Sequence, residues 1–183
     1  MPPKSKNSSA AIQINRALFL FLAVFGCAAD LGTKHWIFAW RGRPLPSNEW
    51  WLWEPYVGIE TALNRGALFG MGQMIGPSGL AVISVLAGGA FCWWGLFGSA
   101  SKDRTLSVTL GVILGGIIGN LYDRIGLWGE QAVRDWILFR YGNYTWPNFN
   151  IADCLLVCGA TSFFFLAFRS NEDSEAVKLA DKR

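Results

Sequence analysis

The chain has 183 residues, of which 52% are hydrophobic, and its mean hydropathy is positive. Soluble domains of this size seldom have such a composition, because their surface must be wetted by water. The net charge of +3 is small and no dense basic run occurs, so we expect no binding to nucleic acid. The four cysteines lie in apolar stretches without a CxxC motif, which favours small packing residues over a metal site or a disulfide framework.

In chain order, a polar and basic segment at 1–16 precedes four apolar stretches. Each is long enough to cross a bilayer, which takes about 20 residues. The predicted spans are 17–40, 78–98, 105–125 and 150–169. The connections are a long loop at 41–77, a short one at 99–104 and a loop at 126–149, and a charged tail follows at 170–183. The sequence thus predicts an all-α polytopic membrane protein with four transmembrane helices.

The distribution of lysine and arginine predicts the orientation, because these residues accumulate on the cytoplasmic side. Nine of them fall in the N-terminal segment, the short loop and the tail, whereas six are spread over the two much longer loops and their borders. We therefore expect both termini in the cytoplasm, with 1–16 as a cytoplasmic segment and 170–183 as a cytoplasmic tail. The loops 41–77 and 126–149 are then extracytoplasmic, and 17–169 is the membrane domain.

The ionisable residues of the spans gather at one depth. Each one costs about 2.5–3.5 kcal/mol on insertion scales and is therefore a functional candidate. In the predicted orientation they lie near the extracytoplasmic boundary, and the inner halves of the spans carry almost none. Asp30 and Lys34 are four residues apart in the first span, so they face the same way. We favour a structural ion pair for these two residues over a direct role in chemistry.

The third span carries a stripe of small residues, Gly111, Gly115 and Gly119, which continues to Asp123 in steps of four. Small residues at this spacing let a second helix approach closely. We therefore expect Asp123 to face a neighbouring helix rather than lipid. Arg124 points in another direction and is placed to reach along the interface toward a carboxylate or a substrate carbonyl. A helix-end charge cluster that reaches water is the alternative role for both residues.

Carboxylates are the groups best equipped for catalysis. The chain has one histidine and lacks GxSxG, HExxH and a glycine-rich phosphate loop, so serine, cysteine and zinc chemistry are poorly supported. Two carboxylates held close share one proton, which provides a base and an acid side by side at neutral pH. Asp153, at the start of the fourth span, is suited to such a pair. The residue types alone leave Asp123 and Asp135 open as its partner.

Four blocks of sequence, in order, resemble those of the lipoprotein signal peptidases (signal peptidase II), a family of membrane-embedded aspartic peptidases. The blocks are DLGTKHW, NRGALFG, GGIIGNLYDRI, and VRDWI followed by WPNFNIAD. The resemblance implies that Asp135 and Asp153 are the catalytic dyad. It implies substrate-binding or supporting roles for Asn64, Gly66, Asn120, Asp123, Arg124 and Asn150. The departures from the family pattern leave every acidic position intact; they are Leu31, Leu68, Arg134 and Trp136.

The resemblance also implies a function. The family removes the signal peptide from prolipoproteins whose cysteine carries a diacylglyceryl group, by a cut just before that cysteine, without a metal or another cofactor. It implies a bacterial inner-membrane hydrolase in contact with membrane lipid, and a small extracytoplasmic β-sheet within 41–77 that cradles the substrate. We expect a monomer.

The alternative function is a small transporter or proton relay protein that uses Asp30, Lys34 and Asp123. A relay needs polar residues through the full thickness of the membrane, whereas here they stop near one side. A scaffold without chemistry leaves the second aspartate and the four ordered blocks unexplained. The sequence therefore favours the peptidase.

Overall fold

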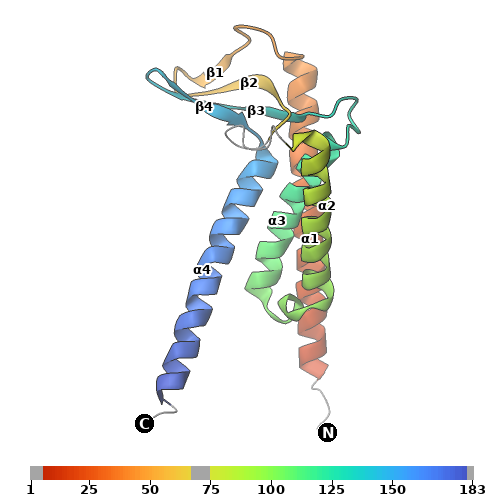
Figure 1. Ribbon diagram of the computed structural model, residues 1–183, viewed down its shortest axis with the longest axis vertical. Helices are drawn as coiled ribbons and strands as arrows, with labels where there is room; N and C mark the ends of the chain where they lie inside the picture. The colour runs from red at the N-terminus through yellow and green to blue at the C-terminus, as the bar shows by residue number, and fades with distance from the viewer. Residues whose placement is uncertain (1–5, 67–74, 181–183) are drawn as a thin grey trace.

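The computed structural model describes residues 6–66 and 75–180. The elements are α1 (Lys6–Arg41), β1 (Trp50–Trp53), β2 (Val57–Asn64), α2 (Gly76–Phe97), the 3₁₀ helix η2 (Ser99–Lys102), α3 (Arg104–Arg124), β3 (Val133–Tyr141), β4 (Tyr144–Phe149) and α4 (Ile151–Ala180). Figure 1 shows α1, α2 and α3 packed together, α4 diverging toward its C-terminal end, and the sheet across one end of the helices. Leu68 and the rest of its block beyond Gly66 lie outside the described residues, as do 1–5 and 181–183.

The four long helices have the length and composition needed to cross a membrane. The qualifying stretches are Ser8–Arg41, Gly76–Phe97, Arg104–Arg124 and Ile151–Phe168. They overlap the four predicted spans, but α1 begins much earlier than residue 17. One reason is Asn15, whose buried side-chain amide donates a hydrogen bond of 3.1 Å to the carbonyl of Ser101 and so ties the first turns of α1 to η2.

The glycine stripe of α3 faces α1, as the sequence predicts. A Cβ added at Gly111 would lie 2.6 Å from the carbonyl oxygen of Phe19, and one added at Gly119 would lie 2.4 Å from Asp30 Oδ2. A side chain at Gly111 would therefore push against the backbone of α1, and one at Gly119 would displace the buried carboxylate of Asp30, so the close approach of the two helices requires glycine at both positions. The expectation that Asp123 faces a neighbouring helix is confirmed, since its side chain is fully buried at the end of this stripe.

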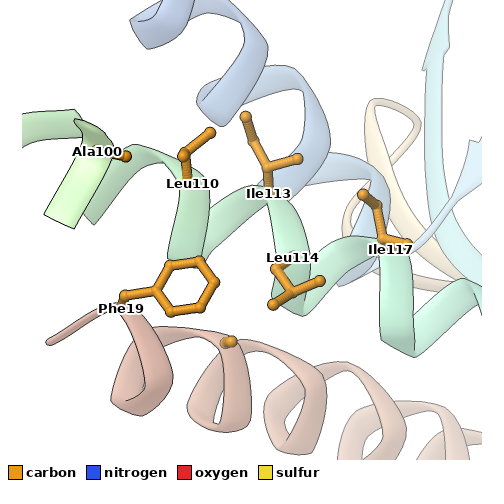
Figure 2. Close-up of a cluster of buried hydrophobic side chains, with 7 residues drawn as sticks. Phe19, Ala100, Leu110, Ile113, Leu114 and Ile117 are labelled. Atoms are coloured by element: carbon orange, nitrogen blue, oxygen red, sulfur yellow. The ribbon is translucent and has the colours of Figure 1, made fainter. Parts of the chain in front are cut away.

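An apolar core fills the space between α1, η2 and α3. Figure 2 shows how the ring of Phe19 packs against the aliphatic side chains of α3. The buried members of this cluster are Phe19, Ala23, Ala100, Leu110, Ile113, Leu114 and Ile117. Among the described residues, the buried charged ones are instead found toward the sheet: Asp30, Lys34, Asp123, Arg134 and Asp135. The interior therefore changes from apolar to charged along the helices.

The four strands form one antiparallel sheet in the order β1-β2-β3-β4. The sequence predicts strands within 41–77, but half of the sheet comes from 126–149, which was expected to be a loop. The segment VRDWILFRY alternates only weakly, with apolar side chains on both faces, and so lacks the usual signal of a half-buried strand. As a result, Asp135 lies in a strand, opposite Ala62 of β2.

Candidate active site

Two carboxylates from separate elements face one groove. Asp135 comes from β3 and Asp153 from the first turn of α4. The groove has a volume of about 1640 Å³, and both residues line it. Its polar lining also includes four residues singled out in the sequence: Asn64, Gly66, Asn120 and Arg124. Below Asp153 the wall continues along α4 with Leu156, Val157 and Cys158. The groove thus joins a polar end to an apolar, membrane-spanning surface.

The start of α4 explains how a carboxylate is held at the end of an apolar helix. Asn150 Oδ1 accepts a hydrogen bond of 3.0 Å from the backbone N–H of Asp153, and Asp153 Oδ2 accepts one of 3.1 Å from the backbone N–H of Asn150. This reciprocal pair is a capping box in which Asn and Asp replace the usual Ser and Glu. The negative charge also lies at the positive end of the helix dipole. Both effects fix the position of the Asp153 carboxylate.

Two asparagine amides connect the two carboxylates. Asn150 Nδ2 donates to Asp135 Oδ1 over 2.6 Å, and Asn120 Nδ2 donates to Asp153 Oδ1 over 2.8 Å. The amides also bond to each other, since Asn150 Nδ2 lies 3.1 Å from Asn120 Oδ1. Asn64 adds a side-chain hydrogen bond to Asp135 and accepts another, of 3.0 Å, from the backbone N–H of Gly66. The carboxylates are therefore held by neutral donors and keep free oxygen positions for other partners.

The environment of Asp135 favours its protonated form. Burial, and after it the negative charge of Asp153, raise the pKa of Asp135 to about 7. The hydrogen bonds from Asn150 and Asn64 and the charge of Lys34 act in the opposite direction but are weaker. A carboxyl group with this pKa can give or take a proton near neutrality.

A buried ion cluster lies behind the two asparagines. Lys34 Nζ lies 2.6 Å from Asp30 Oδ2, 3.2 Å from Asp123 Oδ2 and 2.9 Å from Asn120 Oδ1. The ammonium group thus lies within 3.2 Å of three oxygens, two of them from carboxylates. Asp30 Oδ1 also accepts a hydrogen bond of 2.9 Å from the backbone N–H of Ala152, in the first turn of α4. Asp30 therefore satisfies one of the otherwise unpaired N–H groups of that helix.

Asp123 is bound on both carboxylate oxygens and is not among the residues that line the groove. Arg134 donates to Asp123 Oδ1 from Nη2 at 2.7 Å and from Nε at 3.1 Å, and its backbone N–H donates to Oδ2 at 3.0 Å. Arg134 appears in the sequence only as a departure from a family pattern, so this partner was missed. The sequence carries no short-range signal for this pair, because Asp123 is at the end of α3 and Arg134 is in β3, and the two meet only once the intervening segment folds back.

Arg124 lies where the sequence expects a residue that reaches along the interface. It is half-buried, lines the groove and interacts electrostatically with Asp153 and Asp135. Its Nη1 lies 3.5 Å from Ser84 Oγ of α2. Arg124 is therefore a cation that lines the groove and interacts with both paired carboxylates, whereas Asp123 does not line the groove.

The chain has four helices of membrane-spanning length, and two linked carboxylates lie in a groove at one end of them. These features define a polytopic membrane protein with a site suited to hydrolysis. The chain belongs to the signal peptidase II family: the family model described as "Signal peptidase (SPase) II" matches residues 22–169. It is accordingly a bacterial membrane peptidase of lipoprotein processing.

Similar proteins agree with this assignment. The lipoprotein signal peptidase of Rhodopirellula baltica is 47% identical over 177 residues, which cover 91% of this chain and 79% of that protein. The lipoprotein signal peptidase of Yersinia pestis (strain Pestoides F) is 30% identical over 176 residues, covering 87% and 91%. A solved structure titled "Bacterial membrane enzyme structure by the in meso method at 2.3 A resolution" shares the fold, with a TM-score of 0.72 at 22% identity, over 85% of this chain and 90% of that one.

Proposed function

We propose that this peptidase cleaves diacylglyceryl-modified prolipoproteins just before the lipidated cysteine, by means of a water molecule activated by Asp135 and Asp153. The observation that carries the proposal is the pairing itself. Two carboxylates from β3 and α4 line one groove and are joined through Asn120 and Asn150. The pKa of Asp135, raised to about 7, suits a pair that holds one proton at neutral pH.

The reaction then needs only the two side chains and water. Asp153, as the ionised member, takes a proton from the water, whose oxygen attacks the carbonyl carbon of the scissile peptide bond. Asp135 gives its proton to the developing oxyanion. As the carbon–nitrogen bond breaks, Asp153 passes the proton that it took from water to the leaving amine, and Asp135 recovers its proton as the new carboxyl group forms. Arg124 and Asn64, which line the same groove, are placed to orient the substrate carbonyl. Asn120 and Asn150 keep the two carboxylates in register.

The shape of the groove suits a substrate with a lipid anchor and an apolar signal helix. The polar end supplies the chemistry, and the wall formed by Leu156 and Val157 continues into the membrane span. Both substrate parts then remain in the bilayer while the peptide bond reaches the carboxylates.

We place both termini in the cytoplasm and the sheet and groove at the extracytoplasmic face. The unequal distribution of lysine and arginine supports this orientation, as does Figure 1, in which the Lys6 end of α1 and the Ala180 end of α4 lie opposite the sheet. We retain the division into an N-terminal segment (1–16), a membrane domain (17–169) and a tail (170–183), and a monomeric enzyme.

The experiment compares two forms of one precursor. The purified protein in detergent receives a prolipoprotein whose cysteine carries diacylglycerol and its unmodified twin. We expect cleavage of the modified form and at least about a hundredfold slower cleavage of the twin, since the apolar anchor supplies much of the binding energy. Equal cleavage of the two forms would contradict the proposed substrate.

A further inference from the structure

We propose that Arg134 is a positioning residue of the catalytic pair, which acts through Asp123 and Lys34 to balance the buried charge that faces Asp135. The proposal rests on the function assigned to Asp135 and Asp153 above. Arg134 is not among the described residues that line the groove. Its influence on the reaction must pass through the groups that it contacts.

Arg134 is held by three hydrogen bonds and one aromatic ring. Its buried guanidinium donates to Asp123 Oδ1 from both Nη2 and Nε, and its backbone N–H donates to Asp123 Oδ2. The guanidinium carbon also lies 5.0 Å from the centre of the Trp128 ring, within range of a cation–π interaction. Because the next residue is Asp135, these bonds anchor the start of β3, and with it Asp135, to the end of α3.

A chain of polar contacts leads from Arg134 to the other carboxylate. Asp123 Oδ2 lies 3.2 Å from Lys34 Nζ, which donates to Asn120 Oδ1 over 2.9 Å. Asn120 in turn donates to Asp153 Oδ1 over 2.8 Å. A change in the charge of Asp123 therefore reaches both members of the pair, one through β3 and the other through Lys34 and Asn120.

The charges of the buried cluster cancel. Lys34 and Arg134 supply two positive charges, and Asp30 and Asp123 supply two negative charges. Asp153 of α4 and Lys34 of α1 act on Asp135 directly, and Arg124 of α3 also interacts with it. Asp30, Asp123 and Arg134 belong to the ion cluster around Lys34, and Arg43 and Arg65, which line the groove, both pair with Glu130. Removing the charge of Arg134 leaves the cluster of Asp30, Lys34 and Asp123 with one uncompensated negative charge, which disfavours ionisation of Asp135.

The test measures the rate of cleavage from about pH 5 to about pH 10, where the alkaline limb reports the loss of the proton from the pair. Arg134→Gln makes the cluster net negative, so its alkaline limb moves to higher pH, by up to about 1 unit. Asp123→Asn makes the cluster net positive, and the limb moves to lower pH. The double variant Arg134→Gln with Asp123→Asn restores neutrality, and its limb returns to the position of the unmodified enzyme, whatever its absolute rate.

Arg134→Lys is the matched control, because it keeps the charge but loses the two-pronged contact. Its rate falls while its alkaline limb stays in place. A purely structural role for Arg134 predicts slower variants whose limbs all coincide, and that result would overturn the proposal. If Arg134→Gln does not fold, the other two variants still decide the question, because the limb of Asp123→Asn moves to lower pH while that of the double variant stays at the position of the unmodified enzyme. Failure of the catalytic assignment is recognised separately, by activity that survives in Asp135→Asn.

Discussion

Asp135 determines the expected pH dependence of the reaction. Its pKa of about 7 means that the pair keeps its shared proton at neutral pH and loses it as the pH rises. We expect the cleavage rate to fall above about pH 7, with an apparent upper pKa in that range. Rates measured at saturating lipidated precursor between about pH 5 and about pH 10 check this. A rate that still rises beyond about pH 8 would exclude a protonated Asp135 in the active form.

The same residue should make stability depend on pH. The pKa of Asp135 is raised from 3.8 in the unfolded chain to about 7 in the folded one, so ionisation costs stability as the pH rises through this interval. The cost grows by about 1.4 kcal/mol for each pH unit between the two values. Asp135→Asn removes it and should therefore stabilise the protein more at about pH 8 than at about pH 5. Thermal unfolding in detergent measures the difference, and an equal effect at both values would refute the raised pKa.

At the residue scale, the sequence located the acidic groups but not their partners. From the residue types, Asp123 and Asp135 were equivalent candidates for the second carboxylate. Only the resemblance to signal peptidase II separated them. The structure supplies a physical reason for preferring Asp135, since Asp123 is occupied by Lys34 and Arg134. That reason could not be read from the sequence, because it depends on contacts between α1, α3 and β3.

At the element scale, the start of α4 combines two tasks in Asn150. Its Oδ1 caps the helix, while its Nδ2 donates to Asp135 and Asn120. Asn150→Ser keeps a good cap but cannot reach Asp135, so we expect nearly normal stability with a strongly reduced rate. Asn150→Ala should lose the rate and also about 1 kcal/mol of stability. Paired measurements of unfolding and cleavage test this, and a fully active Asn150→Ser would show that the amide bridge is dispensable.

The packing of α3 against α1 depends on glycine at the contact. Gly111→Ala would place a Cβ 2.6 Å from the backbone oxygen of Phe19, which cannot move without shifting α1. We expect a loss of about 1–3 kcal/mol, as for other overpacked sites. Gly89→Ala on α2 is the control, because a Cβ there meets nothing within 4 Å. Comparable unfolding temperatures for the two variants would contradict this account of the interface.

Helices were easier to predict than strands for a physical reason. Spans of about 20 apolar residues have few alternative explanations, and the four long helices overlap the four predicted spans. Strands β3 and β4 were both missed. Strand β3 presents Asp135, Ile137 and Phe139 on one face and Trp136 and Leu138 on the other. Neither face is clearly polar, so the alternation that identifies a strand is weak.

At the scale of the whole molecule, the orientation in the membrane is open to direct measurement. Asn143 is exposed at the turn between β3 and β4, and Lys102 is exposed in η2; η2 lies just before the first residue of α3, whereas β3 follows its last, so the two residues belong to opposite ends of that helix. Each is replaced by cysteine in a variant whose four native cysteines are changed to alanine. A membrane-impermeant maleimide should label the residue at 143 in spheroplasts and the residue at 102 only after lysis. The reverse labelling pattern would show that the sheet faces the cytoplasm and would contradict the proposed orientation.

The central claim is that Asp135 and Asp153 together activate water, and the direct measurement is cleavage of a lipidated precursor by Asp135→Asn and Asp153→Asn. The control is Asp103→Asn, because Asp103 caps α3 at the opposite end of the molecule and Asn caps equally well. We predict that Asp135→Asn and Asp153→Asn each insert normally but cleave at least about 10³-fold more slowly, because an amide cannot share a proton as the second carboxylate does. The control Asp103→Asn should cleave at the normal rate. Normal cleavage by either Asp135→Asn or Asp153→Asn would contradict the account.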